Sequence, residues 1–186
     1  MTTDSTDLIT IIKQDHREVE EAFLELEKGE GTPEQRRDLV DHVVAELVRH
    51  SVAEEMYMYP AAREHLPNGD ETADHEIEEH AEAEKVMKQL DGVAATDPKF
   101  DELLSTLMAD VRHHIEEEEN DLLPKLQRAC SADQLRDLGR KVLDAKTVAP
   151  TRPHPMAPDT PPANKLLAPG TGLVDRMRDA LVGRRT

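Results

Sequence analysis

The sequence predicts an all-α protein: an antiparallel up-down-up-down four-helix bundle with a short fifth helix and a proline-rich C-terminal tail. Aromatic residues make up only 2% of the 186 residues and tryptophan is absent, so the core has to be aliphatic. Charged residues make up 34%, and runs of β-branched or aromatic residues are few, which favours helices over strands. Apolar residues recur every three or four positions along four long segments, as on the buried faces of bundle helices.

The first two helices are bounded by residues that start and stop helices. The first is predicted from about Ser5 to Lys28, where glycines follow at positions 29 and 31. The second begins at Thr32-Pro33, an N-cap followed by proline at the first helical position, with Gln35 placed for a capping box. It is expected to run to about Pro60 or a little beyond, before the Pro-Asn-Gly breaker at 67–69.

The remaining helices have similar signals. The third is predicted over about 70–92, and the fourth over about 98–130 after an Asp-Pro start, with Pro124 expected to kink or end it. A fifth, short helix is predicted over about 131–146, where Gln134 completes a capping box.

The chain divides in composition near residue 146. Residues 1–146 are expected to form the bundle domain, and 147–186 a separate tail. Seven prolines over 147–172 predict an extended or disordered linker. A short basic amphipathic helix is expected to follow, because its apolar residues have helical spacing: Leu173, Val174, Met177, Ala180 and Leu181.

The net charge of −17 is concentrated in the predicted bundle. Residues 147–186 carry a net +3 and the residues before them a net −20. Such a body repels nucleic acid and anionic lipid, so neither is expected as a partner. No apolar run approaches the ~20 residues that span a bilayer, no secretory signal is seen, and the lone Cys130 cannot form an internal disulfide. A cytoplasmic monomer is expected.

Each long segment places one histidine on its apolar stripe. The histidines lie early in the first and third helices and late in the second and fourth, so antiparallel packing brings them to one level. The predicted core-facing positions, helix by helix, are Ile9, Ile12, His16, Val19, Phe23 and Leu26; Val40, Val43, Leu47, His50, Glu54 and Tyr57; Ala73, Ile77, His80, Glu84 and Met87; and Phe100, Leu104, Leu107, Val111, His114, Glu118 and Asp121.

Three helices add a glutamate one turn after the histidine. Residues at i and i+4 lie about 5–6 Å apart at Cβ, so each pair can reach one common centre. A buried isolated carboxylate is costly, and it normally neutralises, pairs or coordinates a metal. The sequence therefore predicts a metal centre with these candidate ligands: His16, His50, Glu54, His80, Glu84, His114 and Glu118.

Single residues of this set have simpler explanations. One histidine on an apolar stripe is more often a hydrogen-bonded core residue than a ligand, and one His-x-x-x-Glu pair is an ordinary helix-surface contact. The metal interpretation depends on four histidines in register and on two similar segments, HSVAEEMYMYP (50–60) and HIEEEENDLLP (114–124).

Some residues near these segments fall off the stripes. Glu119 stays open as an alternative to the preferred Glu118, because a helix that bends near Pro124 can present the next residue instead. Glu20 and Glu55 lie off the stripes. The other histidines are expected in solvent or around the ligands: His42, His65, His75, His113 and His154.

The donor set also indicates which metal is expected. Four imidazoles with two or three carboxylates exceed what one tetrahedral zinc ion needs. They suit two ions of an octahedral metal with bridging carboxylates, with iron the first choice and manganese the second. Ferritin-like bundles use Glu-x-x-His, with the carboxylate first and i+3 spacing, so the reversed order and i+4 spacing argue against that group.

Four segments, in this order, resemble hemerythrin-like proteins of the HHE cation-binding domain family: DHREVE (15–20), HSVAEEMYMYP (50–60), EEHAEAE (78–84) and HIEEEENDLLP (114–124). The resemblance covers roughly residues 8–130. It implies a four-helix bundle around two non-haem iron ions (Fe²⁺/Fe³⁺), with or without an oxo bridge. The ligands that it implies are His16, His50, Glu54, His80, His114 and Glu118.

Two positions depart from the oxygen-carrying hemerythrins. Those proteins have HxxxH on the third helix, where this chain has His80-x-x-x-Glu84. They have HxxxxD on the fourth, where this chain has His114-x-x-x-Glu118-Glu119. A carboxylate in place of an imidazole makes the site more anionic, which favours ferric iron and lowers the reduction potential. The resemblance then implies redox or peroxide chemistry more than oxygen carriage, and it leaves open whether Glu84 binds iron.

The predicted function is that of a di-iron protein that binds or reacts with O₂, H₂O₂ or NO, in the oxidative-stress response or in sensing. Catalase-like peroxide turnover is its enzymatic version. Tyr57, one turn beyond Glu54, either donates to a bound oxygen species or packs in the core, and packing is the commoner role. The alternatives are iron storage or transfer, and a sensor-adaptor that acts on a protein partner through the tail.

Overall fold

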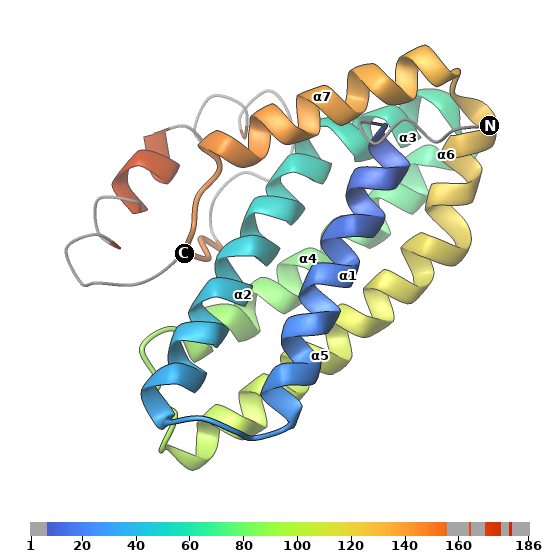
Figure 1. Cartoon of the computed structure of the whole chain (residues 1–186). Coiled ribbons are helices and arrows are strands. Elements are labelled where there is room, and N and C mark those ends of the chain that lie inside the picture. The colour runs from blue at the N-terminus through green and yellow to red at the C-terminus, as the bar shows by residue number, and fades with distance from the viewer. Residues whose placement is uncertain (1–6, 156–163, 165–169, 176–178, 180–186) are drawn as a thin grey trace.

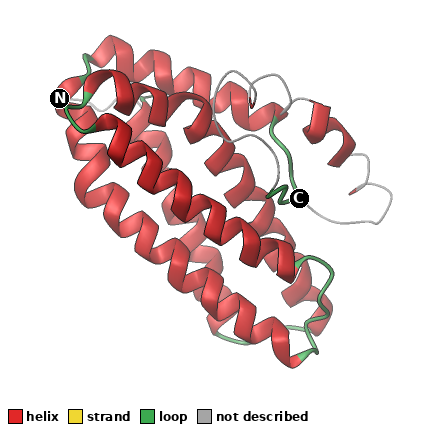
Figure 2. Cartoon of the chain, turned by 180° about the vertical axis from the view of Figure 1, so that it is seen from behind, coloured by secondary structure: helices red, strands yellow, loops and turns green. Residues whose placement is uncertain are grey.

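The structure, a computed structural model, describes residues 7–155, 164, 170–175 and 179 (Figure 1). Four long helices lie side by side in an elongated bundle: α1 (Leu8–Glu27), α2 (Pro33–Ala53), α4 (Gly69–Leu90) and α5 (Pro98–Glu117). The described residues contain helices and loops and no strand (Figure 2). The predicted all-α class is confirmed.

Shorter elements complete the bundle. The π-helical turn η1 (Glu54–Met58) joins α2 to α3 (Tyr59–His65), and η2 (Glu118–Leu122) joins α5 to α6 (Leu123–Ala129). The last of them, α7 (Ala132–Val148), packs along α1 and α2. Within the described part of the chain, no helix combines the length and the apolar character that crossing a bilayer requires.

Helix caps set the observed boundaries. The Asp7 carboxylate accepts a hydrogen bond from the Thr10 backbone N–H at 2.9 Å, so α1 begins at Leu8 and not near Ser5. Both predicted capping boxes are present, at the starts of α2 and α7. The fifth helix continues to Val148, two residues beyond its predicted end.

The two π turns explain how the chain passes through Pro60 and Pro124 without a break. A proline donates no backbone hydrogen bond, so the turn before it can widen to i→i+5 pairing, as the Tyr59 N–H does to the Glu54 carbonyl. The expected kink or end at Pro124 is thus replaced by a π turn.

The additional residue in each π turn changes which side chains face the core. Tyr59 is fully buried, whereas Tyr57 is only half-buried at the edge of the core. Leu122 is buried and Asp121 is exposed. The predictions that Tyr57 and Asp121 occupy the core-facing stripe were therefore wrong, because they assumed 3.6 residues per turn throughout.

The apolar core consists of two clusters with a polar layer between them. One cluster packs residues such as Ile12, Met58 and Leu126 beside α7. The other packs residues such as Phe23 and Phe100 toward the α1–α2 and α4–α5 connections. On α1, His16 lies between Ile12 and Val19, which belong to different clusters, and so marks the polar layer.

The first part of the predicted linker lies against the bundle. Arg152 is buried, and its guanidinium lies 3.1 Å from the Asp91 carboxylate. The backbone N–H of His154 donates to Glu84 at 2.6 Å. Residues 156–163 and 165–169 of the linker lie outside the described residues, and so does most of the expected C-terminal helix over 173–185. Residues 170–175 are described and are helical. The division of the chain near residue 146 stays a prediction.

Candidate metal centre

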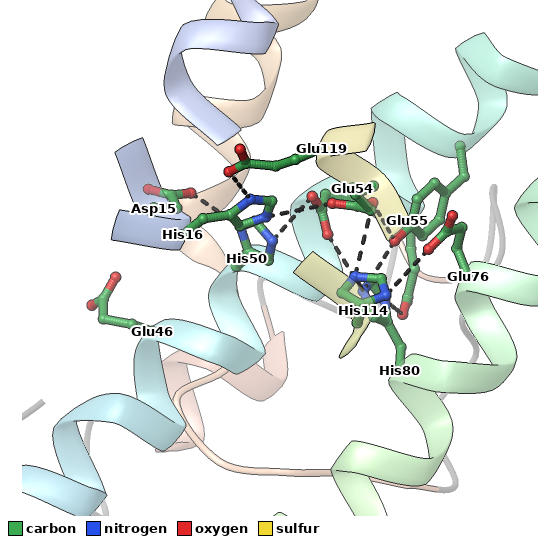
Figure 3. A network of polar contacts seen from close by, with 12 residues as sticks. Asp15, His16, Glu46, His50, Glu54, Glu55, Glu76, His80, His114 and Glu119 are labelled. Atoms are coloured by element: carbon green, nitrogen blue, oxygen red, sulfur yellow. Dashed lines mark hydrogen bonds and ion pairs between the residues drawn. The ribbon is translucent and has the colours of Figure 1, made fainter. Parts of the chain in front are cut away.

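Four histidines meet in the middle of the bundle (Figure 3). His16 comes from α1, His50 from α2, His80 from α4 and His114 from α5, and all four are buried. The imidazoles form two pairs. The ring centroids of His16 and His50 lie 5.1 Å apart, and those of His80 and His114 lie 4.7 Å apart. The structure thus brings together the four histidines that the stripes singled out.

Glu54 and Glu118 lie between the two pairs, and both have 0% exposure. One oxygen of Glu54 lies 3.0 Å from His50 Nε2, and the other lies 3.4 Å from His80 Nε2. Glu118 has the same arrangement between the other two histidines: one oxygen lies 3.4 Å from His16 Nε2, and the other lies 3.8 Å from His114 Nε2. Each carboxylate therefore turns one oxygen toward each histidine pair, as a carboxylate that bridges two cations does.

A further carboxylate contacts the outward ring nitrogen, Nδ1, of each of the four histidines of the centre. These contacts join His16 to Glu119 at 3.0 Å, His50 to Asp15 at 3.1 Å and His80 to Glu55 at 3.1 Å (Figure 3). His114 Nδ1 lies 2.9 Å from Glu79 and 3.1 Å from Glu76. A proton on Nδ1 that is donated outward leaves the Nε2 lone pair directed at the centre, and the contact fixes the orientation of the ring.

Donor atoms of the buried residues form overlapping groups. Within each group, the atoms lie within 4.8 Å of one another. Adjacent donors of an octahedral ion with ~2.1 Å bonds are about 3 Å apart, and opposite donors about 4 Å apart. The groups are His16, His50, Glu54 and Glu118; Glu54, His80 and His114; and Glu76, His114 and Glu118. Six of the seven predicted ligands are among them.

Glu84 is the predicted ligand that the structure does not bring to the centre. It is half-buried and accepts the His154 backbone N–H. In an antiparallel bundle α4 runs opposite to α2 and α5. A residue of α4 level with Glu54 and Glu118 must therefore precede His80, and the position one turn before is Glu76, which is 3% exposed. Glu84 therefore lies outside the donor groups, whereas Glu76 lies within one, 3.1 Å from the outward Nδ1 of His114.

Glu118 and Glu119 approach His16 from different sides. Glu118 faces the centre, whereas Glu119 contacts the outer nitrogen of His16. Glu55, which lay off the predicted stripe, has the corresponding role at His80. The sequence stripes therefore indicated the inner groups but not the outer carboxylates, which lie one position off each stripe.

Electrostatic effects within the cluster are strong. Burial alone would lower the pKa of His50, but the carboxylates of Glu54 and Asp15 outweigh it and raise that pKa to about 10. Burial also opposes the charged forms of His80 and His114, yet neighbouring carboxylates raise both pKa values. Without a metal ion, protons on these imidazoles therefore supply the positive charge.

The carboxylates show the complementary behaviour. Burial alone would raise the pKa of Glu54, but the imidazoles of His50 and His80 bring it well below its usual range. The pKa of Glu76 is raised, first by burial, although His114 opposes the rise. The cluster is therefore a buried set of ionisable groups that requires cations of some kind.

Unpartnered atoms test whether metal ions fit this cluster. Among the described residues, His16 Nε2, both oxygens of Glu54 and Glu118 Oε2 are buried and make no hydrogen bond apart from the His–Glu contacts at 3.0–3.4 Å within the centre. Buried polar atoms normally have partners, and these all belong to one donor group. A set of neutral imidazoles and carboxylates suits a borderline or hard divalent ion. The residues present thus fit two metal ions.

Tyr59 is a component of the centre that the stripes did not indicate. Its hydroxyl donates to Glu118 at 3.1 Å and lies 3.0 Å from His80 Nε2. Burial, and then the charges of Glu118 and Glu54, raise the pKa of its hydroxyl well above the usual value, so it keeps its proton. The signal for Tyr59 was the proline that follows it, which permits the π turn.

A small cavity adjoins the four imidazoles. Its volume is about 30 Å³, and its other lining residues include Val19, Leu47, Ala83, Met87, Val111 and Ile115. A space of ~10–15 Å³ holds one water molecule, so this cavity suits a molecule of two or three heavy atoms. The centre therefore has a mainly apolar space beside it that excludes large ligands.

Comparison with known proteins agrees with this geometry. Residues 7–126 match the family described as the hemerythrin HHE cation binding domain. An uncharacterized hemerythrin-like protein of Schizosaccharomyces pombe is 28% identical over 171 residues, covering 91% of this chain and 84% of that protein. A DNA nickase of Nostoc sp. is 24% identical over 137 residues, covering 74% of this chain and 38% of the nickase.

A solved structure has the same fold. It is a hemerythrin HHE cation binding domain-containing protein from Mycobacterium kansasii, with a TM-score of 0.65 and 19% identity, covering 76% of this chain and 85% of that one. The family match spans the four helices that carry the buried histidines and glutamates. The chain belongs to the hemerythrin HHE cation binding domain family.

Proposed function

We propose that this chain is a cytoplasmic non-haem di-iron protein whose buried centre binds or reacts with O₂, H₂O₂ or NO, in redox response or sensing. The observation that supports it most is the position of Glu54 and Glu118, each with one oxygen toward each histidine pair. Iron is the first choice for this donor set and manganese the second. When bound, such ions supply Lewis acidity and, for iron, electrons.

The chain's own groups have distinct roles in this proposal. The imidazole Nε2 atoms and the two central carboxylates hold the ions, and the outer carboxylates orient the rings. Tyr59 keeps a proton within hydrogen-bond distance of Glu118. The side chains of the 30 Å³ cavity admit a small ligand and limit water.

Two alternatives have weaker support. Iron storage requires room for many ions, whereas the buried donor groups share their residues and suit a pair of ions. The nicking of DNA named for the Nostoc relative is not carried over, because residues 1–146 have a net charge of −20 and repel phosphate. The sensor-adaptor version stays a second candidate, because residues 151–155 lie against α4 near the centre.

Metal content and an optical spectrum test the proposal. Protein purified without added metal should contain about two irons per chain, and H₂O₂, O₂ or NO should change its spectrum. His114→Ala should lose iron and the spectral response, and the exposed His42→Ala should keep both. Peroxide turnover that disappears in His114→Ala would identify an enzyme, whereas a spectral change without turnover would identify a carrier or sensor. One zinc per chain, or no metal in a folded protein, would contradict the proposal.

A further inference from the structure

A second group of histidines and glutamates lies on the surface between α4 and α5. His75 and Glu79 are one turn apart on α4, and His113 and Glu117 are one turn apart on α5. Both pairs have the order His-x-x-x-Glu, as His50–Glu54 and His114–Glu118 have in the centre. The two histidines were expected to lie in solvent or around the ligands, and their side chains are 54% and 63% exposed.

Antiparallel packing places the two pairs head to tail. His75 Nε2 lies 3.0 Å from one oxygen of Glu117 and 3.7 Å from Glu79 Oε1. His113 Nε2 lies 3.4 Å from the other oxygen of Glu117 and 3.7 Å from the same Glu79 oxygen. Each imidazole therefore faces both carboxylates, and donor atoms of His75, Glu79 and Glu117 lie within 4.8 Å of one another.

These distances suit a four-coordinate ion. Two donors bound at ~2.0–2.1 Å to a tetrahedral ion lie about 3.4 Å apart, and the four N···O separations lie between 3.0 and 3.7 Å. Two imidazoles and two carboxylates are a donor set that zinc-like divalent ions accept. We propose that His75, Glu79, His113 and Glu117 form a surface site for a divalent transition-metal ion, separate from the buried centre.

The surrounding groove supports a cation there. Its lining is strongly acidic, and Lys125, the basic residue of the lining, is paired with Asp121 at 2.5 Å. The acidic lining residues beyond the site include Glu71, Asp74, Glu76, Glu78, Glu116 and Asp121. Such a concave acidic surface raises the local concentration of cations.

Two carboxylates connect the groove with the buried centre. Glu76 is 3% exposed and lines the groove, and its Oε2 lies 3.1 Å from His114 Nδ1. Glu79 turns Oε1 toward the surface histidines and Oε2 toward His114 Nδ1, at 2.9 Å. The Glu79 carboxylate would therefore connect a cation in the surface site to His114 of the buried centre.

Zinc titration of the full-length, metal-free chain tests the proposal. The parent should bind one more Zn²⁺ per chain than His75→Ala/His113→Ala, as measured by isothermal titration calorimetry. The matched control, His42→Ala/His65→Ala, removes two histidines outside every donor group of the described residues and should keep the parental stoichiometry. Because the comparison counts a difference of one ion, it stands even if the buried centre binds no iron.

Crystals soaked in Zn²⁺ provide a measurement that does not depend on a variant folding. An anomalous peak at the zinc edge should lie ~2.0–2.1 Å from Nε2 of His75 and His113. Equal zinc stoichiometry in both double variants, or anomalous peaks confined to the buried centre, would overturn the proposal and leave these four residues as ordinary surface ion pairs.

Discussion

At the scale of single residues, burial separates the central carboxylates from the many acidic side chains of this chain. Glu54 and Glu118 have 0% exposure, and oxygens of both lack hydrogen-bond partners. A charged group in such a place is costly unless a cation is nearby. The negative charge of these two residues is therefore the property to test.

Glu54→Gln should remove the charge with little change in shape. We expect loss of at least one of the two metal ions, because an amide cannot neutralise and bridge cations as a carboxylate does. Metal analysis of the purified variant measures the loss. Glu18→Gln, at an exposed position of α1, is the control and should keep the parental metal content. Full metal content in Glu54→Gln would contradict a bridging role.

Tyr59→Phe tests the hydroxyl at the centre. The ring should still fill its buried site, so the fold should persist, while Glu118 loses the hydrogen bond that it accepts. Loss of such an outer partner typically lowers metal affinity about 10–100-fold. Competition with a chelator of known affinity measures this change, and Tyr57→Phe, at the half-buried position, should leave the affinity unchanged.

The pKa of His50 predicts how stability depends on pH in the metal-free protein. Its value of about 10 lies above the ordinary 6.5, so its stabilising contribution is fully present below about pH 6.5 and is lost as the pH rises toward 10. The thermal midpoint of chelator-treated protein should therefore fall over this range, by an amount equivalent to a few kcal/mol. The fall should be smaller in His50→Gln, and an equal fall in both proteins would contradict this assignment.

At the scale of elements, the π turns η1 and η2 determine which residues after the glutamates face inward. Both begin at a central glutamate and end shortly before a proline. Because a π turn holds one more residue than an α-helical turn, it presents Tyr59 where regular spacing would present Tyr57. The helical stripe was reliable up to each glutamate and failed beyond it.

Deleting Tyr57 should convert η1 into an ordinary helical turn. Tyr59 then becomes the fourth residue after Glu54, which in a regular helix lies on the same face, so Tyr59 should stay buried together with His50 and Glu54. We expect the loss of stability to be smaller than the ~3–5 kcal/mol that removal of a large core side chain costs. Thermal unfolding measures it. Deleting Ala45, inside the regular helix α2, rotates the residues after it by about 100° and should cost much more.

At the scale of the whole molecule, the polar layer lies across the bundle and divides its apolar core. Four helices contribute to this layer, so repulsion or attraction within it acts on all of them together. Metal binding to the folded state alone stabilises a protein by mass action, by about 2.7 kcal/mol when free metal is 100 times the dissociation constant. Folding and metal content should therefore be linked.

Metal removal tests this linkage. Chelator treatment should lower the thermal midpoint, and adding back Fe²⁺ under reducing conditions should restore it. Scanning calorimetry on the same sample before, during and after chelation measures both changes. A midpoint that does not respond to metal would indicate that protons on the imidazoles stabilise the fold as well as cations do.

Much of this organisation could be predicted from the sequence, for identifiable reasons. Caps such as Thr32 and Ser131 act locally, so the starts of α2 and α7 were readable. The six inner residues, from His16 to Glu118, could be found because helical spacing is regular before each π turn. Glu76 was missed because both it and Glu84 lie four residues from His80, and a single helix does not distinguish the two directions.

The sequence by itself determined the helical class, the four histidines that share one level, and the two glutamates that follow them on α2 and α5. The tertiary structure decided which carboxylates meet these groups from other helices, because that depends on helix direction and rotation. It placed Glu76, and not Glu84, next to His114, placed Tyr59 at the centre, and set His75 and His113 around shared carboxylates. Spacing along one chain fixes a helix face, but only packing between helices fixes which faces meet.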